Sequence, residues 1–465
     1  MYQRVNARIL RQLEGIVGLE NVLLDAERLE PYTHDETVGL RAEPEVVVRA
    51  TSAQQVSDVF KLANLERVPV TPRGAGYGLS GGAVAVEGGI VLTLEKMNRV
   101  LEIDHANLMV TVEPGLITGE LHRAVEAEGL FYPPDPASLD SCTIGGNSAE
   151  GAGGPRAVKY GVTKDYVCGL EAVLPSGEIV RMGGKLVKDV TGYSLMQLLV
   201  GSEGTLAVVT QIILRLLPLP AYQVDLFVPF DDFQTAADAV SGMISRRIVP
   251  TAIEFMERDI VHACQQFLDK ELPFADAQAQ LLIKLDDNNK AALDEDMETV
   301  ADLCLDAGAQ DVLVAADRPT SDRLWEARRA IIDALNFESP VNHMEDVVVP
   351  RAQIPALLRG IHDLAECLGV RILSFGHAGD GNVHITALKD NLDDETWEAI
   401  VLEVTESIYR MALSLGGTLT GEHGIGFIRR QYLSLALEEA QIEIMRGIRA
   451  TFDPNGILNP GKIFP

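Results

Sequence analysis

Apolar and polar residues alternate in two different ways along this chain. From about Val46 to Leu219, short β-branched runs are separated by turns rich in glycine and proline. We expect few helices in this region, such as Ser52–Glu66 and Ile117–Glu128. The first pattern therefore predicts short strands joined by irregular loops.

After the sequence LLPLP, which ends at Pro220, strands alternate with amphipathic helices. The expected strands are 223–228, 251–256, 280–285, 311–315, 346–349 and 370–375. The expected helices are 231–247, 258–269, 290–307, 321–335 and 352–368, followed by two closing helices near 394–415 and 438–451. This pattern predicts an α+β domain with an antiparallel sheet.

The composition is that of an ordinary globular protein of 465 residues, of which 47% are hydrophobic. The chain has 39 Lys and Arg against 68 Asp and Glu, and a formal charge of −29 opposes binding to nucleic acid or anionic lipid. No apolar run approaches the ~20 residues that span a bilayer, and the N-terminus resembles an amphipathic helix without a signal-peptide core. We therefore expect a cytoplasmic protein.

Five cysteines are scattered along the chain without a C-x-x-C pair. A disulfide framework, a zinc ribbon and an iron–sulfur site are therefore not indicated. Electrons that enter such a chain would need an acceptor outside it.

Three patches are rich in glycine. The first, 72–82 (PRGAGYGLSGG), contains G-x-G-x-x-G after a short expected strand at 67–71. A dinucleotide fingerprint needs a helix next, but 82–94 has the pattern of a strand, a turn and a strand, which disfavours a Rossmann fold. Such a loop can bind a pyrophosphate through its backbone N–H groups, or it can be a turn without a ligand. The other patches are 142–154 (CTIGGNSAEGAGG) and 201–206 (GSEGTL).

His377 and His384 flank the sequence AGDGNV. Side chains alternate along a strand, so an odd separation on one strand would place the two rings on opposite faces. Because Asp-Gly favours a turn, we expect a hairpin that brings the second histidine beside the first. Two neighbouring imidazoles suit a divalent metal ion.

Glu422 and His423 lie between glycines in GEHGIG. Glu422 would complete a His, His, Glu metal set, and His423 would then be left as a general base, which its ordinary pKa suits. The alternative for each histidine is a surface or core residue with its own hydrogen bonds.

Helix geometry orients one arginine. On a helix over 321–335, Arg328 lies close to the apolar face that Leu324 and Ile331 share, whereas Arg329 points away. A cation at that edge needs an anionic partner. The partner is either a substrate carboxylate or a nearby acidic side chain.

Taken together, the three glycine patches, GHAGDGNVH, GEHGIG and the closing FDPNGILNPGK resemble the FAD-dependent 2-hydroxyacid dehydrogenases of the vanillyl-alcohol oxidase superfamily. The resemblance extends from about residue 15 to the C-terminus. Within this family, the sequence most resembles the flavin subunit of electron-transfer-flavoprotein-linked lactate dehydrogenase, and next that of glycolate oxidase. The resemblance implies an α+β fold with a two-subdomain FAD-binding domain at 1–219, behind an N-terminal helix. It also implies a substrate domain at 220–418 and a segment at 419–465 that returns to the FAD domain.

The resemblance also implies site residues. The FAD pyrophosphate would lie on Arg73, Gly74, Gly76, Tyr77, Gly78 and Leu79. The flavin would be lined or approached by Pro134, Gly145, Asn147, Ser148, Gly153, Gly154, Glu203, Val208 and Asn459. His377, His384 and Glu422 would bind the metal (Zn, Fe or Mn), His423 would be the base, and Arg328 would bind the substrate carboxylate.

This sequence departs from the family pattern at several positions. Gly151 replaces the asparagine of the usual second patch, which removes a side-chain donor. Ile332 and Thr386 stand where hydroxyglutarate enzymes carry Thr and Asn, which argues against a dicarboxylate. The first patch has no histidine, so we expect non-covalent FAD.

The implied reaction is hydride transfer from C2 of lactate, as the D enantiomer, or of glycolate to flavin N5, with the metal on the 2-hydroxyl and His423 removing its proton. Electrons would pass to an electron-transfer flavoprotein, an iron–sulfur subunit or a quinone, so the enzyme could lie at a membrane through its partner. The alternatives are D-2-hydroxyglutarate dehydrogenase, an alkylglycerone-phosphate-synthase-like transferase, a metal-dependent hydrolase and a non-catalytic flavin-binding subunit.

Overall fold

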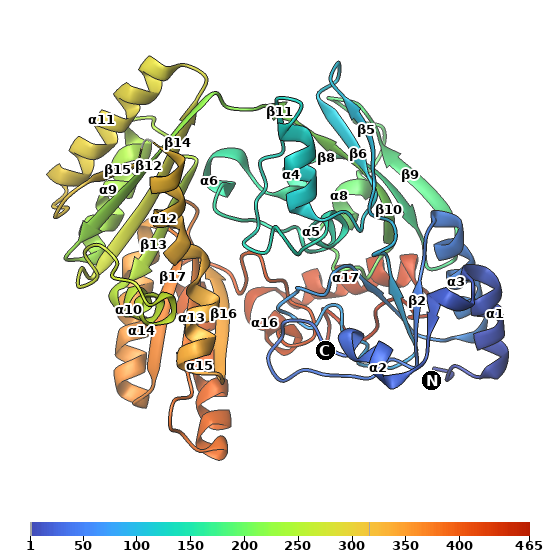
Figure 1. Ribbon diagram of the computed structural model, residues 1–465. Coiled ribbons are helices and arrows are strands. Elements are labelled where there is room, and N and C mark those ends of the chain that lie inside the picture. Colours follow the sequence, from blue (N-terminus) through green and yellow to red (C-terminus); the bar gives the residue numbers. More distant parts are fainter. Residues whose placement is uncertain (1, 316) are drawn as a thin grey trace. The chain divides into compact units, whose positions relative to one another are not determined.

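The computed structural model describes residues 2–315 and 317–465 (Figure 1). The chain forms two compact units. The first consists of residues 1–153, 162–219 and 422–465, and the second of residues 154–161 and 220–421. Each unit is described by itself.

The first unit contains a small sheet in the order β1-β2-β4-β3. Its strands are β1 (Val22–Leu23), β2 (Val46–Arg49), β3 (Val70–Arg73) and β4 (Ile90–Thr93), and β2, β4 and β3 run parallel. Helices α1 (Ala7–Val17) and α3 (Ala53–Glu66) pack against it and against each other (Figure 1). Ser52 caps α3 by accepting a hydrogen bond from the N–H of Gln55, so the helix expected over 52–66 is confirmed.

Residues 74–89 join the parallel strands β3 and β4 without a helix, as expected for the first glycine patch. The expectation of two strands over 82–94 is only half right. β4 forms, but residues 82–89 are turns, and Gly88 and Gly89 adopt φ values of 70° and 74°. A strand cannot continue through such left-handed positions.

A second sheet of the first unit is antiparallel, in the order β5-β6-β10-β8-β9. Its strands are β5 (Val100–Asp104), β6 (Met109–Val112), β8 (Val167–Val173), β9 (Ile179–Gly183) and β10 (Val208–Arg215). Strands β7 (Leu130–Phe131) and β11 (Leu217–Pro218) form a separate two-stranded sheet. The other α-helices described in this unit are α2 (Ala26–Leu29), α4 (Thr118–Glu126), α5 (Ile144–Glu150), α7 (Thr163–Tyr166), α8 (Leu195–Leu199), α16 (Leu433–Ala436) and α17 (Glu439–Phe452).

The second unit is built on a seven-stranded sheet in the order β15-β12-β14-β13-β17-β18-β16. The strands are β12 (Tyr222–Phe230), β13 (Ala252–Glu257), β14 (Ala279–Asp287), β15 (Leu313–Ala315), β16 (Asn342–Val348), β17 (Arg371–His377) and β18 (Asn382–Leu388). All neighbouring pairs are antiparallel, which confirms the sheet that the second pattern predicts.

Helices contact both faces of this sheet (Figure 1). One group is α10 (Arg258–Leu268), α12 (Arg318–Arg329) and α13 (Ile331–Glu338). The other is α9 (Phe233–Ser245), α11 (Lys290–Asp306), α14 (Ile354–Leu368) and α15 (Asp394–Ser414), and the short α6 (Ala157–Tyr160) contacts β13. The single helix expected over 321–335 is wrong in one respect, because the chain divides at Ala330 into α12 and α13.

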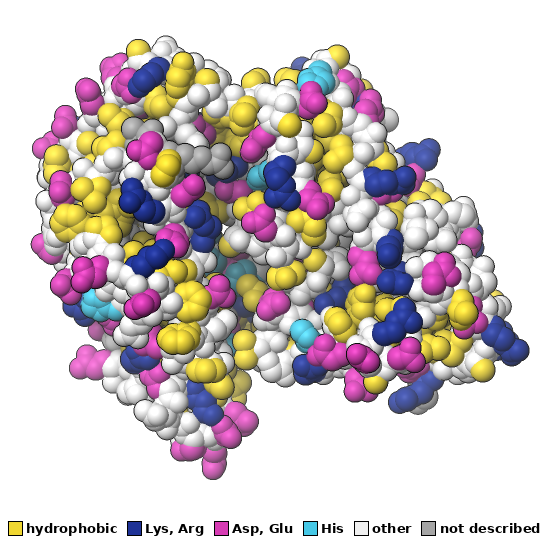
Figure 2. All heavy atoms as spheres, in the orientation of Figure 1, with side chains coloured by type: hydrophobic (Ala, Val, Ile, Leu, Met, Phe, Trp, Pro, Cys, Tyr) yellow, Lys and Arg dark blue, Asp and Glu magenta, His cyan; other side chains and the backbone are white. Residues whose placement is uncertain are grey.

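Among the described residues, no helix is long and apolar enough to cross a membrane. Figure 2 shows acidic side chains spread over the visible face, with lysines and arginines scattered among them. The visible face therefore offers no large basic surface for nucleic acid.

Candidate functional site

The first glycine patch presents a run of backbone donors. In the described part of the chain, none of the N–H groups of residues 74–82 donates a hydrogen bond to a protein acceptor. Gly76 and Gly81 adopt φ values of 82° and 76°, so the loop turns where a Cβ would be strained. Residues 74–79 are half-buried or exposed, but residues 80–82 are buried, where a backbone N–H normally has a partner. Such a run fits a phosphate-bearing ligand, which supplies acceptors.

Arg73 is buried at the start of this patch and points into the protein. Its Nη1 donates to the carbonyl of His34 at 2.8 Å and its Nη2 to the carbonyl of Pro31 at 2.9 Å. Burial lowers the pKa of Arg73, and the carboxylate of Asp35 opposes that effect. The structure thus uses both Nη groups of Arg73 to hold residues 31–34. Tyr77, in the same patch, is 46% exposed.

The second patch forms α5. A Cβ on Gly74 would lie 2.5 Å from the hydroxyl of Thr143, the N-cap of α5, so the first two patches pack closely. Asn147 donates to Thr118 Oγ1 at 2.8 Å and Ser148 donates to the carbonyl of Ile144 at 2.9 Å. Both of these side chains, which we expect to line the flavin, therefore bond within the protein.

The other expected flavin neighbours are divided between the units. Gly145 donates its N–H to the carbonyl of Pro114, and the carbonyl of Pro134 contacts His122 Nε2 at 2.9 Å. Gly153 and the buried Val208 belong to the first unit, whereas Gly154 begins the short segment of the second.

Glu203 and Asn459 hold three loops of the first unit together. Glu203 accepts the N–H groups of Ile425 and Gly426 at 2.8 and 2.7 Å, which fixes the loop after His423. Asn459 Nδ2 donates to the carbonyls of Gly82 and Glu203, at 3.1 and 3.0 Å. These residues therefore join the first patch, the third patch and the loop that contains His423.

The structure adds Glu150, which the sequence patterns did not single out. A Cβ on Gly424 would lie 2.5 Å from Glu150 Oε2, so this carboxyl packs against the GEHGIG loop. Burial raises the pKa of Glu150 well above its ordinary value, and the negative charge of Glu203 raises it further. The only sequence signal for Glu150 was its position as an acidic residue among the glycines of the second patch.

The histidine hairpin of the second unit forms as expected. β17 and β18 are antiparallel neighbours, with Phe375 opposite His384 and His377 opposite Asn382. Directly opposed residues share a face, so both histidines lie on one face of the sheet. Their ring centroids are 5.3 Å apart, and one ring nitrogen of each lies within 4.8 Å of the other. This spacing fits two ligands of one metal ion.

Arg328 is buried, whereas Arg329 is exposed, as the helix geometry predicts. Arg328 Nε donates to Glu254 Oε2 at 2.6 Å, and the other oxygen of Glu254 contacts His377 Nδ1 at 2.6 Å. Burial raises the pKa of Glu254, but the positive charges of His377 and Arg328 outweigh it and the pKa is lowered. A protein carboxylate is thus one partner of Arg328, which sequence reasoning left open.

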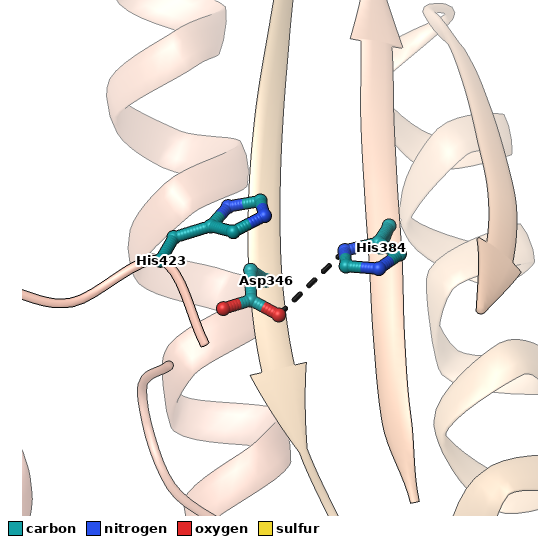
Figure 3. A group of neighbouring side chains, drawn as sticks. All are labelled: Asp346, His384 and His423. Carbon is teal, nitrogen blue, oxygen red and sulfur yellow. Dashed lines mark ion pairs between the residues drawn. The ribbon is translucent and has the colours of Figure 1, made fainter. Parts of the chain in front are cut away.

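A second buried carboxylate lies beside the other histidine. Asp346 is opposite His384 in the pair β16 and β18, and its Oδ1 lies 3.6 Å from His384 Nδ1 (Figure 3). Its Oδ2 accepts the hydroxyl of Thr420 and the N–H of Gly421, at 2.8 and 2.9 Å. Asp346 therefore anchors Thr420 and Gly421, the two residues that directly precede Glu422.

Glu422 and His423 are the first residues of the returning part of the first unit. A Cβ on Gly153 would lie 3.0 Å from Glu422 Oε2, so Glu422 packs against the second glycine patch. The N–H of Gly421 donates to Asp346, and Glu422 and His423 are the next two residues of the chain.

The two positions that differ from hydroxyglutarate enzymes are not equivalent. Thr386 is fully buried on the same face as His384, and its hydroxyl has no partner among the described residues. Ile332 is 42% exposed on α13.

Two family models match the chain. The C-terminal domain of FAD linked oxidases matches residues 219–463, and an FAD binding domain matches residues 44–183. The chain belongs to the FAD-linked oxidases. It is therefore an FAD-linked oxidoreductase whose FAD-binding domain, of the vanillyl-alcohol oxidase type, is joined to a C-terminal domain with a large antiparallel sheet.

Full-length relatives support this membership. The chain is 42% identical to the glycolate oxidase subunit GlcD of Bacillus subtilis (strain 168), covering 98% of this chain and 96% of the relative. It is 39% identical to the D-lactate dehydrogenase of Anaerostipes hadrus, covering 99% and 98%. A solved structure of p-cresol methylhydroxylase with substrate bound shares the fold, with a TM-score of 0.80 at 18% identity over 98% of this chain and 96% of that one.

Proposed function

We propose that this FAD-linked oxidoreductase converts a short 2-hydroxy acid, D-lactate or glycolate, to the 2-oxo acid. One observation carries the proposal. In the second unit, His377, His384 and Arg328 are all buried, and each lies beside a buried carboxylate. Imidazoles for a cation and a guanidinium for a carboxylate are the groups that recognise a small hydroxy acid. The full-length relatives named for glycolate and D-lactate support the same substrate class.

The unpaired N–H groups of residues 74–82 support the first patch as the site of the FAD pyrophosphate. When bound, FAD supplies the hydride acceptor that no side chain can provide. We assign Arg73, Asn147, Ser148, Glu203 and Asn459 to shaping this site, because their side chains bond the glycine patches or the loops beside them. The remaining cofactor-binding residues of the family pattern stay assigned to the FAD site, without a covalent link.

For the divalent metal we propose His377, His384 and Glu422 as ligands. The two histidines fit because they share a face and offer nitrogens within 4.8 Å of each other. A bound cation would polarise the substrate hydroxyl and favour its alkoxide form.

His423 is proposed to accept the proton of the substrate hydroxyl. Its loop is fixed by Glu203 at Ile425 and Gly426, so the imidazole is carried by an anchored turn. Arg328 would bind the substrate carboxylate. In the described part of the chain its Nε bonds Glu254 while neither Nη nitrogen donates to a protein acceptor, so two donors are available.

Electrons would leave through an electron-transfer flavoprotein, an iron–sulfur subunit or a quinone. The described cysteines form no disulfide, and three of the five are buried. We propose a cytoplasmic enzyme that reaches a membrane only through such an acceptor.

The test is an anaerobic absorbance trace of the yellow protein mixed separately with D-lactate, L-lactate, glycolate and D-2-hydroxyglutarate. We expect D-lactate or glycolate to bleach the flavin fastest. Faster bleaching by D-2-hydroxyglutarate would instead assign a dicarboxylate substrate. No bleaching by any of the four acids would contradict the proposal and favour a non-redox reaction such as that of an alkylglycerone-phosphate-synthase-like transferase.

A further inference from the structure

Glu254 lies between the arginine and one of the histidines of the second unit. It is on β13, directly opposite His377 of β17, and its side chain is completely buried. One oxygen contacts His377 Nδ1 and the other accepts from Arg328 Nε, each at 2.6 Å. A single carboxylate therefore serves two groups with different proposed tasks.

The contact with His377 determines which ring nitrogen can bind a metal. An ionised carboxylate only accepts hydrogen bonds, so Nδ1 of His377 must carry a proton. Nε2 is then left as the metal ligand, and the carboxylate also increases the basicity of the ring.

The contact with Arg328 determines how the guanidinium lies. Nε is fixed by Glu254, and the Cζ atom lies over the ring of Phe375, 5.2 Å from its centroid. Glu254 thus holds one edge of the planar group and Phe375 one face, which leaves the pair of Nη nitrogens to bind a second carboxylate end-on.

We propose that Glu254 is a positioning residue that sets the metal-binding tautomer of His377 and the substrate-binding orientation of Arg328. This inference rests on the proposed function. It predicts that one substitution weakens two separate binding events, metal and hydroxy acid, without touching either ligand.

The test variant is Glu254→Gln, which keeps the shape of the side chain. Its single carbonyl oxygen can serve Arg328 or His377, but not both. When the oxygen accepts from Arg328, the amide N–H₂ faces His377 and favours the tautomer with the proton on Nε2, which cannot bind a cation.

The matched control is Glu345→Gln. Glu345 is also buried in this sheet and lies 2.8 Å from a histidine, His343. It bonds Thr405 and Tyr409 of α15, however, and neighbours Asp346 on β16, so it lies on the other face from His384. The control substitution removes the same charge, but on the face of the sheet opposite to the proposed ligands His377 and His384.

Zn²⁺ affinity is measured by chelator competition on the FAD-loaded proteins, and kcat and KM are measured with the acid that bleaches the wild type fastest. For Glu254→Gln we expect Zn²⁺ affinity about 10–100-fold weaker, as for other partners of metal-ligating histidines, and a raised KM. FAD content and Tm should match those of Glu345→Gln, whose Zn²⁺ affinity should equal that of the wild type.

Zn²⁺ affinities of Glu254→Gln and Glu345→Gln within twofold of each other would overturn the inference, as would a wild type that binds no Zn²⁺. A weaker affinity that only parallels a loss of Tm would also overturn it, because the carboxylate would then be a folding element alone. Absence of bleaching by any hydroxy acid would contradict the proposed substrate, while the Zn²⁺ comparison would still decide the role of Glu254.

Discussion

At the scale of single residues, His423 carries the proposed proton transfer. Replacing it with alanine should lower kcat on the order of 10²–10⁴-fold, the usual contribution of a general base, while FAD content stays unchanged. Steady-state kinetics and the flavin absorbance of the purified variant measure both effects. His105→Ala, at an exposed histidine of the first unit, is the matched control, and near-normal turnover of His423→Ala would remove this residue from its assigned role.

Glu150 should make the stability of the protein depend on pH. Burial, followed by the charge of Glu203, raises its pKa in the folded state above the unfolded value of about 4.3. A carboxyl with a raised pKa stabilises the fold below the unfolded pKa, and this contribution is lost as pH rises toward the folded pKa.

Glu150→Gln, which imitates the protonated acid, should therefore raise Tm at pH 8 and have little effect at pH 4. The expected gain is a few degrees, since roughly 1 kcal/mol moves Tm by about 2–4 °C in a domain of this size. Thermal unfolding of the FAD-loaded protein across this pH range measures it, with the exposed Glu126→Gln as control. An equal Tm difference at pH 4 and pH 8 would show that Glu150 is not held protonated.

The sequence predicted residues of this site unequally. His377, His384 and Arg328 could be placed because strand and helix periodicities determine their faces. Glu254 and Asp346 could not, because their partners are far away in the sequence and only the strand order brings them together. Glu150 could not be distinguished from a solvated acid for the same reason.

At the scale of elements, the hairpin of β17 and β18 depends on one glycine in its turn. Gly381 has a φ of 95°, and a Cβ there would collide with the carbonyl of Val349. Gly381→Ala should therefore destabilise the hairpin by about 1–3 kcal/mol and lower the metal content of the purified protein.

Gly369→Ala is the control for this prediction. Gly369 also has a positive φ, of 63°, but a Cβ there would meet no atom within 4 Å. Chemical denaturation and metal analysis of both variants separate the collision from the backbone preference. Equal losses in the two variants would mean that the contact with Val349 contributes nothing.

Among the elements, regular patterns were predicted best. The strands and helices of the second unit follow from clear changes of period, whereas the first strand expected in 82–94 was wrong because Gly88 and Gly89 impose turns. The division of α12 from α13 at Ala330 has no glycine or proline to indicate it. The inclusion of residues 154–161 in the second unit is likewise a long-range effect, in which Lys159 pairs with Asp286 of β14.

At the scale of the whole molecule, the proposed cofactors depend on different parts of the chain. The proposed FAD residues are, with the exception of Gly154, in the first unit, whereas two of the three proposed metal ligands, His377 and His384, are in the second and Glu422 is in the first. Treating the protein with a chelator should therefore remove the metal and leave the yellow FAD in place.

The metal-depleted protein should be bleached by hydroxy acid on the order of 10²-fold more slowly or not at all, because a bound cation contributes several kcal/mol to stabilising the developing alkoxide. Adding Zn²⁺, Mn²⁺ or Fe²⁺ should restore bleaching, and the ion that restores it best identifies the metal. Anaerobic stopped-flow absorbance measures the rate before and after each addition, with a mock-dialysed sample as control. An unchanged rate after complete metal removal would leave His423 and Arg328 to activate the substrate alone, and the two histidines would then be structural.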